Sequence, residues 1–158
     1  GAVLGLISHT FISSGLFFSI GFLYKRYKTR LIYYYGGLMY FMPLFATCLL
    51  LLLLGNVAFP GTLAFVSEVL LLFVVVIKSG FLALFILFVT FVLSVVVSFR
   101  LFNRIFCGYM KWIVMGGKLY DLSGKELIIL LVLIILLIYW GIYTGPLYEF
   151  IPNFYKNI

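Results

Sequence analysis

One acidic side chain stands alone in a long apolar stretch of the sequence. Glu68 is the only charged residue between Leu44 and Ile77. A carboxylate at membrane depth costs roughly 2.5–3.5 kcal/mol on insertion scales, so such residues usually face a protein interior or a water-filled route. In such a place a carboxylate can take up and release protons. Glu68 is therefore the first candidate for proton handling, and the alternative is a structural hydrogen bond between helices.

The only histidine, His9, lies in another apolar segment. On a helix it would share a polar stripe with nearby hydroxyl residues, namely Ser8, Ser13 and, more loosely, Thr10 and Ser14. Imidazole is the side chain best suited to passing protons near neutral pH. We expect a proton relay at His9, with Ser13 and Ser67 as candidates for lining the same path. A histidine that only satisfies local hydrogen bonds is the alternative.

The residues before Glu68 predict an interrupted helix. The break is expected from Gly55 to Thr62, at Gly55, Asn56, Pro60, Gly61 and Thr62. Proline lacks a backbone N–H and clashes with the preceding turn, while glycine adds conformational freedom. Unwound backbone at membrane depth is tolerated where it is buried in protein or lines a cavity, and it recurs at ion sites of transporters. Asn56 and Thr62 could satisfy the freed backbone groups or hold water, and a kink without function is the alternative.

The composition indicates a helical membrane protein. Hydrophobic residues make up 66% of the chain and charged residues 9%, and the mean hydropathy is +1.28. A soluble domain of this length could not cover its surface with so few charges. The sequence has no phosphate-binding glycine loop, nucleophile–base pair or metal-ligand spacing, and Cys48 and Cys107 form no CxxC motif. We therefore expect no cofactor on this chain and no nucleic-acid partner, with the net charge of +7 reflecting membrane topology.

The apolar runs predict a single membrane domain over residues 1–158, all α-helical, with about four membrane-spanning helices. The spans are expected at about 1–23, 43–77, 80–105 and 125–144. Three of them are close to the ~20 residues that cross a ~30 Å hydrocarbon core. Ser123 and Glu126 have the spacing of a capping box at the start of the last span.

The segment 43–77 could be one broken span or two short spans joined by a turn. As one straight helix it would be ~52 Å long, more than a bilayer requires. With one broken span, nine of the 11 basic residues share a membrane face: Lys25, Arg26, Lys28, Arg30, Arg100, Arg104, Lys111, Lys118 and Lys125. Lys78 and Lys156 lie opposite. The positive-inside rule favours this arrangement, with the shared face toward the cytoplasm or the mitochondrial matrix.

Four segments, in order along the chain, resemble one known family. The segment at residues 1–30 resembles one that ends in YERxHTR, and GNVAFPGTLAFVSEVLLL resembles ANxxlPGTxxFxGEfLIL. SFRLFNRIFCG resembles YSLxxYNRxxxG, and YDLSGKE resembles the DLNGRE start of a final helix. Together they are similar to the antiporter-like chain 4 (M-type) subunits of NADH:ubiquinone oxidoreductase, respiratory complex I. FPGT followed by F-x-x-E is the most specific match, because sister subunits carry Lys in place of that Glu.

The resemblance implies the C-terminal part of a subunit with fourteen helices, the second helix of this part being discontinuous. It implies a terminal place in a proton path for Glu68 and a relay toward it for His9. NADH, flavin, iron–sulfur clusters and ubiquinone are expected on other subunits. The expected partners are lipids and other membrane-arm subunits, including the N-terminal part of the same subunit. The expected location is the mitochondrial inner membrane, with a bacterial plasma membrane as the alternative.

Three positions depart from the family pattern. Lys25 and Lys28 replace the Glu and His of YERxHTR, and Ser67 replaces the Gly before the family's glutamate. We expect a proton-translocating module of the respiratory chain, one subunit of a translocase with no redox chemistry of its own. Two alternatives stay open: a subunit of a multi-subunit cation/proton antiporter, and a structural fragment that conducts nothing.

Overall fold

The computed structural model describes residues 1–78, 80–109 and 120–146 of the chain. Within these ranges it has five α-helices, two short 3-10 helices and no strand. The α-helices are α1 (Ala2–Tyr27), α2 (Pro43–Asn56), α3 (Leu63–Lys78), α4 (Gly80–Phe106) and α6 (Gly124–Ile142). The 3-10 helices η1 (Ile32–Tyr34) and η2 (Leu38–Tyr40) lie between α1 and α2. Helices α1, α4 and α6 are long and apolar enough to cross a membrane, so the prediction of an all-helical membrane chain is confirmed.

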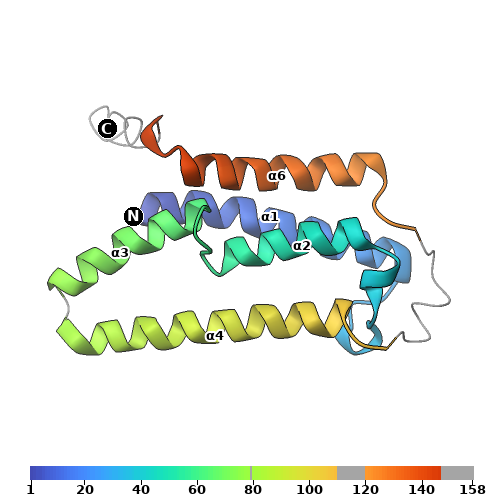
Figure 1. The fold of residues 1–158 in the computed structure, drawn as a ribbon, viewed down its shortest axis with the longest axis horizontal. Helices are drawn as coiled ribbons and strands as arrows, with labels where there is room; N and C mark the ends of the chain where they lie inside the picture. Colours follow the sequence, from blue (N-terminus) through green and yellow to red (C-terminus); the bar gives the residue numbers. More distant parts are fainter. Residues whose placement is uncertain (79, 110–119, 147–158) are drawn as a thin grey trace.

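Helices α2 and α3 form one interrupted rod. Figure 1 shows both running in the same direction along the bundle, opposite to α1 and α4 and the same way as α6. Residues 43–78 thus make a single passage with a break at residues 57–62, and they do not form a hairpin. The prediction of a second span broken near Gly55–Thr62, based on proline, glycine and charge, is confirmed.

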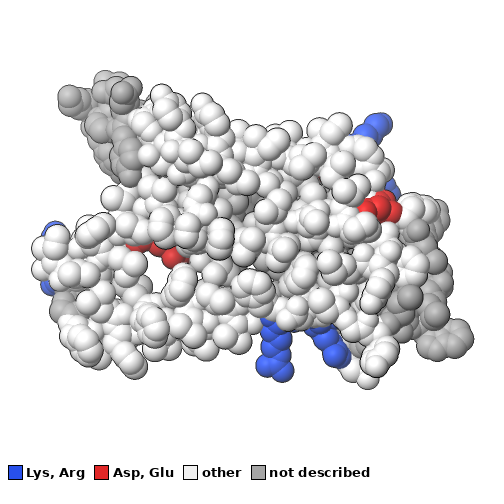
Figure 2. Space-filling model, viewed as in Figure 1, with Lys and Arg blue, Asp and Glu red and all other residues white. Residues whose placement is uncertain are grey.

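Most described basic residues gather toward one end of the bundle. They lie after α1, near the end of α4 and at the start of α6: Lys25, Arg26, Lys28, Arg30, Arg100, Arg104 and Lys125. Lys78 ends α3 at the opposite end, and Figure 2 shows a largely uncharged face between the basic groups. Lys111, Lys118 and Lys156 lie outside the described residues.

Helix α1 is the centre of the packing. Its buried residues recur every three or four positions, the spacing that places side chains on one helix face: Leu4, Ser8, Ile12, Gly15, Ser19, Leu23 and Tyr27. Helices α2, α3 and α6 all contact α1. Helix α4 is buried only toward its C-terminal end, where the rings of Phe45 and Phe106 lie 5.6 Å apart. The N-terminal half of α4 therefore stands largely free of the bundle.

Candidate functional site

The chain leaves α2 through a compact turn that satisfies the helix end. The Phe59 N–H donates to the Leu54 carbonyl and the Ala58 N–H to the Gly55 carbonyl, both at 3.0 Å. This pair of bonds is a Schellman arrangement, which requires a left-handed residue after the helix. Ala58 takes that conformation with a φ of 53°. The helix therefore ends in a defined structure before Pro60 is reached.

Gly61 and Thr62 shape the backbone between the end of α2 and the start of α3. Gly61 has a φ of 95°, a backbone conformation that favours glycine. The buried Thr62 then donates its hydroxyl hydrogen to the Phe59 carbonyl at 2.8 Å. Thr62 thus satisfies a backbone group freed by the break, one of the two roles considered for it. The side chain of Asn56 has no hydrogen-bond partner within the described part of the chain.

Helix α6 closes one side of the break. A methyl group built on Gly141 would lie 2.4 Å from the Gly61 carbonyl oxygen and 2.5 Å from the Thr62 carbonyl carbon. Leu137 lies one turn before Gly141 in α6, and a methyl group built on Gly55 of α2 would lie 2.5 Å from one of its methyl carbons. The two backbones therefore meet with no space between them. The sequence analysis missed Gly141, which carries no local signal apart from being a glycine in an apolar helix.

The other side of the break opens into a cleft of about 1020 Å³ between α3 and α4. Figure 1 shows these helices diverging from their shared end toward the break. The polar side chains that line the cleft are Asn56, Glu68, Thr90 and Ser94, among phenylalanine and leucine residues. Figure 2 shows acidic atoms recessed below the surface in the hollow between α3 and α4. Glu68 and the break residues Asn56 and Pro60 thus share one cavity, here called the α3–α4 cleft.

Glu68 faces this cleft without a partner. Its side chain is exposed in the isolated chain, and it forms no hydrogen bond or ion pair with any described residue. The adjacent Ser67 is buried, donates to the Ala64 carbonyl at 2.7 Å and faces Gly5 of α1. The carboxyl group is therefore left to water or to another polypeptide, while Ser67 serves the packing of α3 on α1.

His9 lies at the depth of the break and outside the cleft. Along α1, Gly5 lies beside Ser67 of α3, and Ile12 lies beside Gly55 near the end of α2. His9 lies between Gly5 and Ile12 in α1, so its depth is between those of Ser67 and Gly55. The imidazole is exposed and makes no hydrogen bond or ion pair with the described residues. The half-buried Ser13, one turn further, donates to the Thr10 carbonyl at 3.3 Å. Among the described residues, no hydrogen bond or ion pair therefore joins His9 or Ser13 to Glu68.

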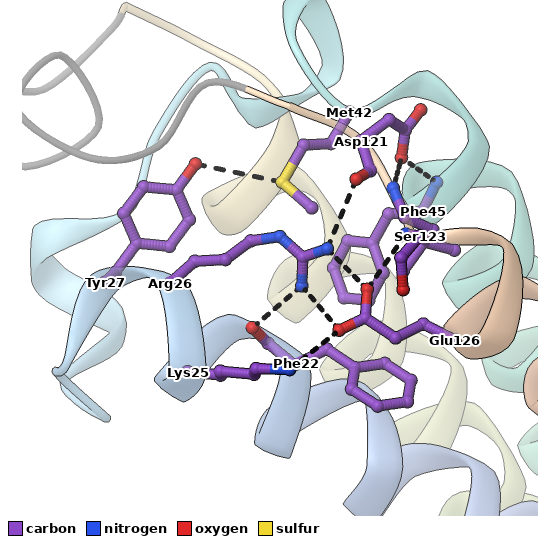
Figure 3. Close-up of polar contacts among 10 residues, drawn as sticks. Phe22, Lys25, Arg26, Tyr27, Met42, Phe45, Asp121, Ser123 and Glu126 are labelled. Carbon is purple, nitrogen blue, oxygen red and sulfur yellow. Dashed lines mark hydrogen bonds and ion pairs between the residues drawn. The ribbon is translucent and has the colours of Figure 1, made fainter.

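A buried ion pair lies at the basic end of the bundle (Figure 3). Arg26 of α1 binds both carboxylate oxygens of Glu126 of α6, with Nη2–Oε2 at 2.5 Å and Nη1–Oε1 at 3.4 Å. Only 5% of the Arg26 side chain and 9% of the Glu126 side chain are exposed. The same guanidinium donates to the carbonyls of Phe22 and Asp121. This cluster fastens the C-terminal end of α1 to the start of α6.

Asp121 extends this cluster to a third helix. Its carboxylate accepts hydrogen bonds from the backbone N–H groups of Leu44 (2.7 Å) and Phe45 (3.1 Å), and so caps the N-terminus of α2. The predicted capping box of Ser123 and Glu126 is present, with the Ser123 N–H donating to Oε2 at 3.0 Å. From the sequence, Arg26 is predicted only as one of the basic residues that set the membrane topology. The presence of two acids at an otherwise basic membrane face was the signal that could have revealed the pair.

Comparison with known proteins gives one family and a consistent set of relatives. The family model described as NADH:quinone oxidoreductase/Mrp antiporter, TM matches residues 1–94. NADH-ubiquinone oxidoreductase chain 4 of Acanthamoeba castellanii is 39% identical over 142 residues, which cover 90% of this chain and 28% of that protein. Chain 4 of Chondrus crispus is 41% identical over 147 residues, covering 92% of this chain and 29% of the relative. Chain 4 of Marchantia polymorpha is 35% identical over 160 residues, which cover 100% of this chain and 32% of that protein. The chain thus spans less than a third of the length of these relatives.

Proposed function

Because this chain belongs to the family of NADH:quinone oxidoreductase and Mrp antiporter membrane subunits, we propose that it is part of a proton-translocating subunit of NADH:ubiquinone oxidoreductase. Similarity to chain 4 of that enzyme over most of its length supports this assignment. The redox reaction, with its NADH, flavin, iron–sulfur clusters and ubiquinone, takes place on other subunits. The chain lies in the mitochondrial inner membrane, where the rest of its own subunit and other membrane-arm subunits surround it.

The observation that carries the proposal is the position of Glu68. A carboxylate that faces a cleft beside an interrupted helix, without an ion partner among the described residues, has its proton-exchanging oxygens available to water. A Glu68 carboxylate that stayed ionised against lipid would be costly. Contact with water along a proton route would offset this cost, because the charge would then be solvated. In this proposal Glu68 takes up a proton from one side of the membrane and releases it to the other when the enzyme turns over.

His9 completes the route from a position on α1 outside the cleft. It lies at the depth of the break on a surface that the described residues leave exposed. We propose that the remaining part of the subunit covers this surface and that protons reach His9 from there. The hydroxyl of Ser13 lies one helical turn away and lines the same surface. Contact between His9 and Glu68 then runs through water, since no direct bond joins them.

A subunit of a multi-subunit cation/proton antiporter is the second candidate, because the matching family includes both kinds of protein. The named relatives favour the respiratory enzyme. Gentle solubilisation of the native membrane, followed by native electrophoresis, separates the two candidates. We expect the chain to migrate in a very large assembly that oxidises NADH. Migration in a smaller assembly without that activity would favour the antiporter.

A further inference from the structure

Two hydroxyl residues of α4 face the same cleft as Glu68. Thr90 and Ser94 lie one helical turn apart, so they occupy the same face of α4. Both line the α3–α4 cleft, and the other α4 residues that line it are leucine and phenylalanine. Both positions fall within the residues matched by the family model and outside the four short motifs described in the sequence analysis. Polar side chains on an otherwise apolar helix need an explanation.

The depths of these residues match those of the polar groups across the cleft. Helix α3 ends at Lys78 and α4 begins at Gly80, so both helices can be measured from this shared end. Glu68 lies ten residues before Lys78 and Thr90 ten residues after Gly80, about 15 Å along each helix at 1.5 Å per residue. Thr90 and Glu68 are therefore at the same depth.

Ser94 lies one turn further, at the level of the break. The next hydroxyl residue of α4, Ser98, is buried beside Leu53 and Leu54, near the end of α2. Ser94 falls between Thr90 and Ser98, opposite the residues that follow Leu54, which include Asn56. The three side chains of Asn56, Ser94 and Thr90 thus form a polar series from the break to the depth of Glu68.

Asn56, Ser94 and Thr90 all keep hydrogen-bonding capacity that water in the cleft could use. The Thr90 hydroxyl donates to the Leu87 carbonyl at 2.9 Å and the Ser94 hydroxyl to the Phe91 carbonyl at 2.8 Å. Each oxygen keeps lone pairs that can accept a bond from the cleft. The Asn56 amide, without a partner among the described residues, offers both donors and an acceptor. Leaving such groups against hydrocarbon is unfavourable, and a bound water that bridges them removes the penalty.

We propose that Thr90 and Ser94, together with Asn56, hold a chain of water molecules that connects the helix break with Glu68. Helix α4 then forms one wall of the proton route, with its hydroxyl oxygens as the fixed points of the water chain. The inference rests on the proposed proton exchange at Glu68. It assigns to α4 a part in the transport step.

The test removes both hydroxyls and keeps their volume, in the assembled enzyme. The double variant Thr90→Val/Ser94→Ala is expected to lower the rate of NADH-driven proton translocation by about 2- to 10-fold, the range expected when one hydrogen bond is lost from the transport step. Thr90→Ser/Ser94→Thr keeps both hydroxyls and is expected to retain translocation. Ser98→Ala, on the same helix and outside the cleft, is the matched control and is expected to have no effect. Normal translocation by the assembled double variant would overturn the inference.

A parallel measurement on Glu68→Gln separates this inference from the proposed function. If that variant loses translocation and the hydroxyl double variant does not, the function stands and the water chain is wrong. If Glu68→Gln translocates normally, both are wrong.

Accessibility to water gives a second readout that does not depend on turnover. In a Cys107→Ser background, cysteine at position 90 or 94 is expected to react with a membrane-impermeant methanethiosulfonate reagent, because the reaction needs a thiolate in contact with water. Leu93→Cys, next to Ser94 and outside the cleft, is expected to stay unreacted. Failure of both Thr90→Cys and Ser94→Cys to react would overturn the inference. This test remains decisive if the Thr90→Val/Ser94→Ala variant fails to assemble.

Discussion

Arg26 and Glu126, 100 residues apart in the sequence, form a buried ion pair that joins α1 to α6. The pair lies at the basic end of the bundle, at the opposite end of the molecule from Lys78. The carbonyl of Asp121 also accepts from Arg26, and the Asp121 carboxylate caps α2. One cluster thus joins the C-terminal end of α1, the start of α2 and the start of α6.

Glu126→Gln is expected to destabilise the assembled enzyme strongly, because it leaves the Arg26 charge buried without its counter-ion. Breaking a buried pair in this way costs about 3–5 kcal/mol. Lys25→Ala is the matched control: its Nζ lies 3.9 Å from Glu126, but the side chain is 77% exposed, and exposed pairs contribute about 0–1 kcal/mol. The amount of assembled enzyme and its thermal midpoint measure both effects. Equal stability of the two variants would contradict the importance of the buried pair.

Asp121→Ala is expected to loosen the first turn of α2. The lost cap corresponds to about 0.5–2 kcal/mol, and Asp121→Asn, which keeps an accepting oxygen, is expected to lose less. Hydrogen exchange at the backbone amides of Leu44 and Phe45 measures the change directly, since both donate to Asp121. Unchanged exchange in Asp121→Ala would show that the cap does not hold this helix.

Gly141→Ala is expected to impair both assembly and translocation. The added methyl group would lie 2.4 Å from the Gly61 carbonyl oxygen, so α6 or the break must move. Overpacking of this kind costs about 1–3 kcal/mol. Gly124→Ala, on the same helix with open space around it, is the control and should behave like the parent protein. Normal assembly and translocation in Gly141→Ala would refute a tight contact between α6 and the break.

His9→Gln is expected to slow translocation without loss of assembly, because the side chain is exposed and forms no hydrogen bond or ion pair with the described residues, and glutamine keeps its polarity without titrating. Thr10→Val, at the neighbouring exposed position, is the control and should leave translocation unchanged. The rate of NADH-driven proton translocation, measured with the amount of assembled enzyme, distinguishes a relay from a packing residue. Equal rates in both variants would exclude the relay.

The features that were predictable from sequence are those that depend on local residues. Pro60 and Gly61 signal the break through backbone restrictions that act within a few residues, and Ser123 and Glu126 signal their capping box in the same way. The distribution of basic residues distinguished one broken span from a hairpin because topology follows charge in the loops.

The contacts between distant segments were not predictable. In a membrane protein the lipid-facing residues are as apolar as the buried ones, so periodicity does not reveal which face of α1 or α6 is packed. Nothing local to Gly141 indicates that Gly61 lies against it, and nothing local to Asp121 points to Leu44. The α3–α4 cleft was missed for the same reason, and with it the positions of Thr90 and Ser94.

The central claim is that Glu68 exchanges protons during turnover, and Glu68→Gln tests it most directly. Glutamine keeps the shape and polarity of the side chain and removes its proton. Proton uptake into sealed membrane vesicles during NADH oxidation should be measured beside the amount of assembled enzyme, with Glu68→Asp as the titratable control. We expect Glu68→Gln to assemble and to lose translocation, and Glu68→Asp to retain part of it. Translocation at the parent rate in assembled Glu68→Gln would contradict the account.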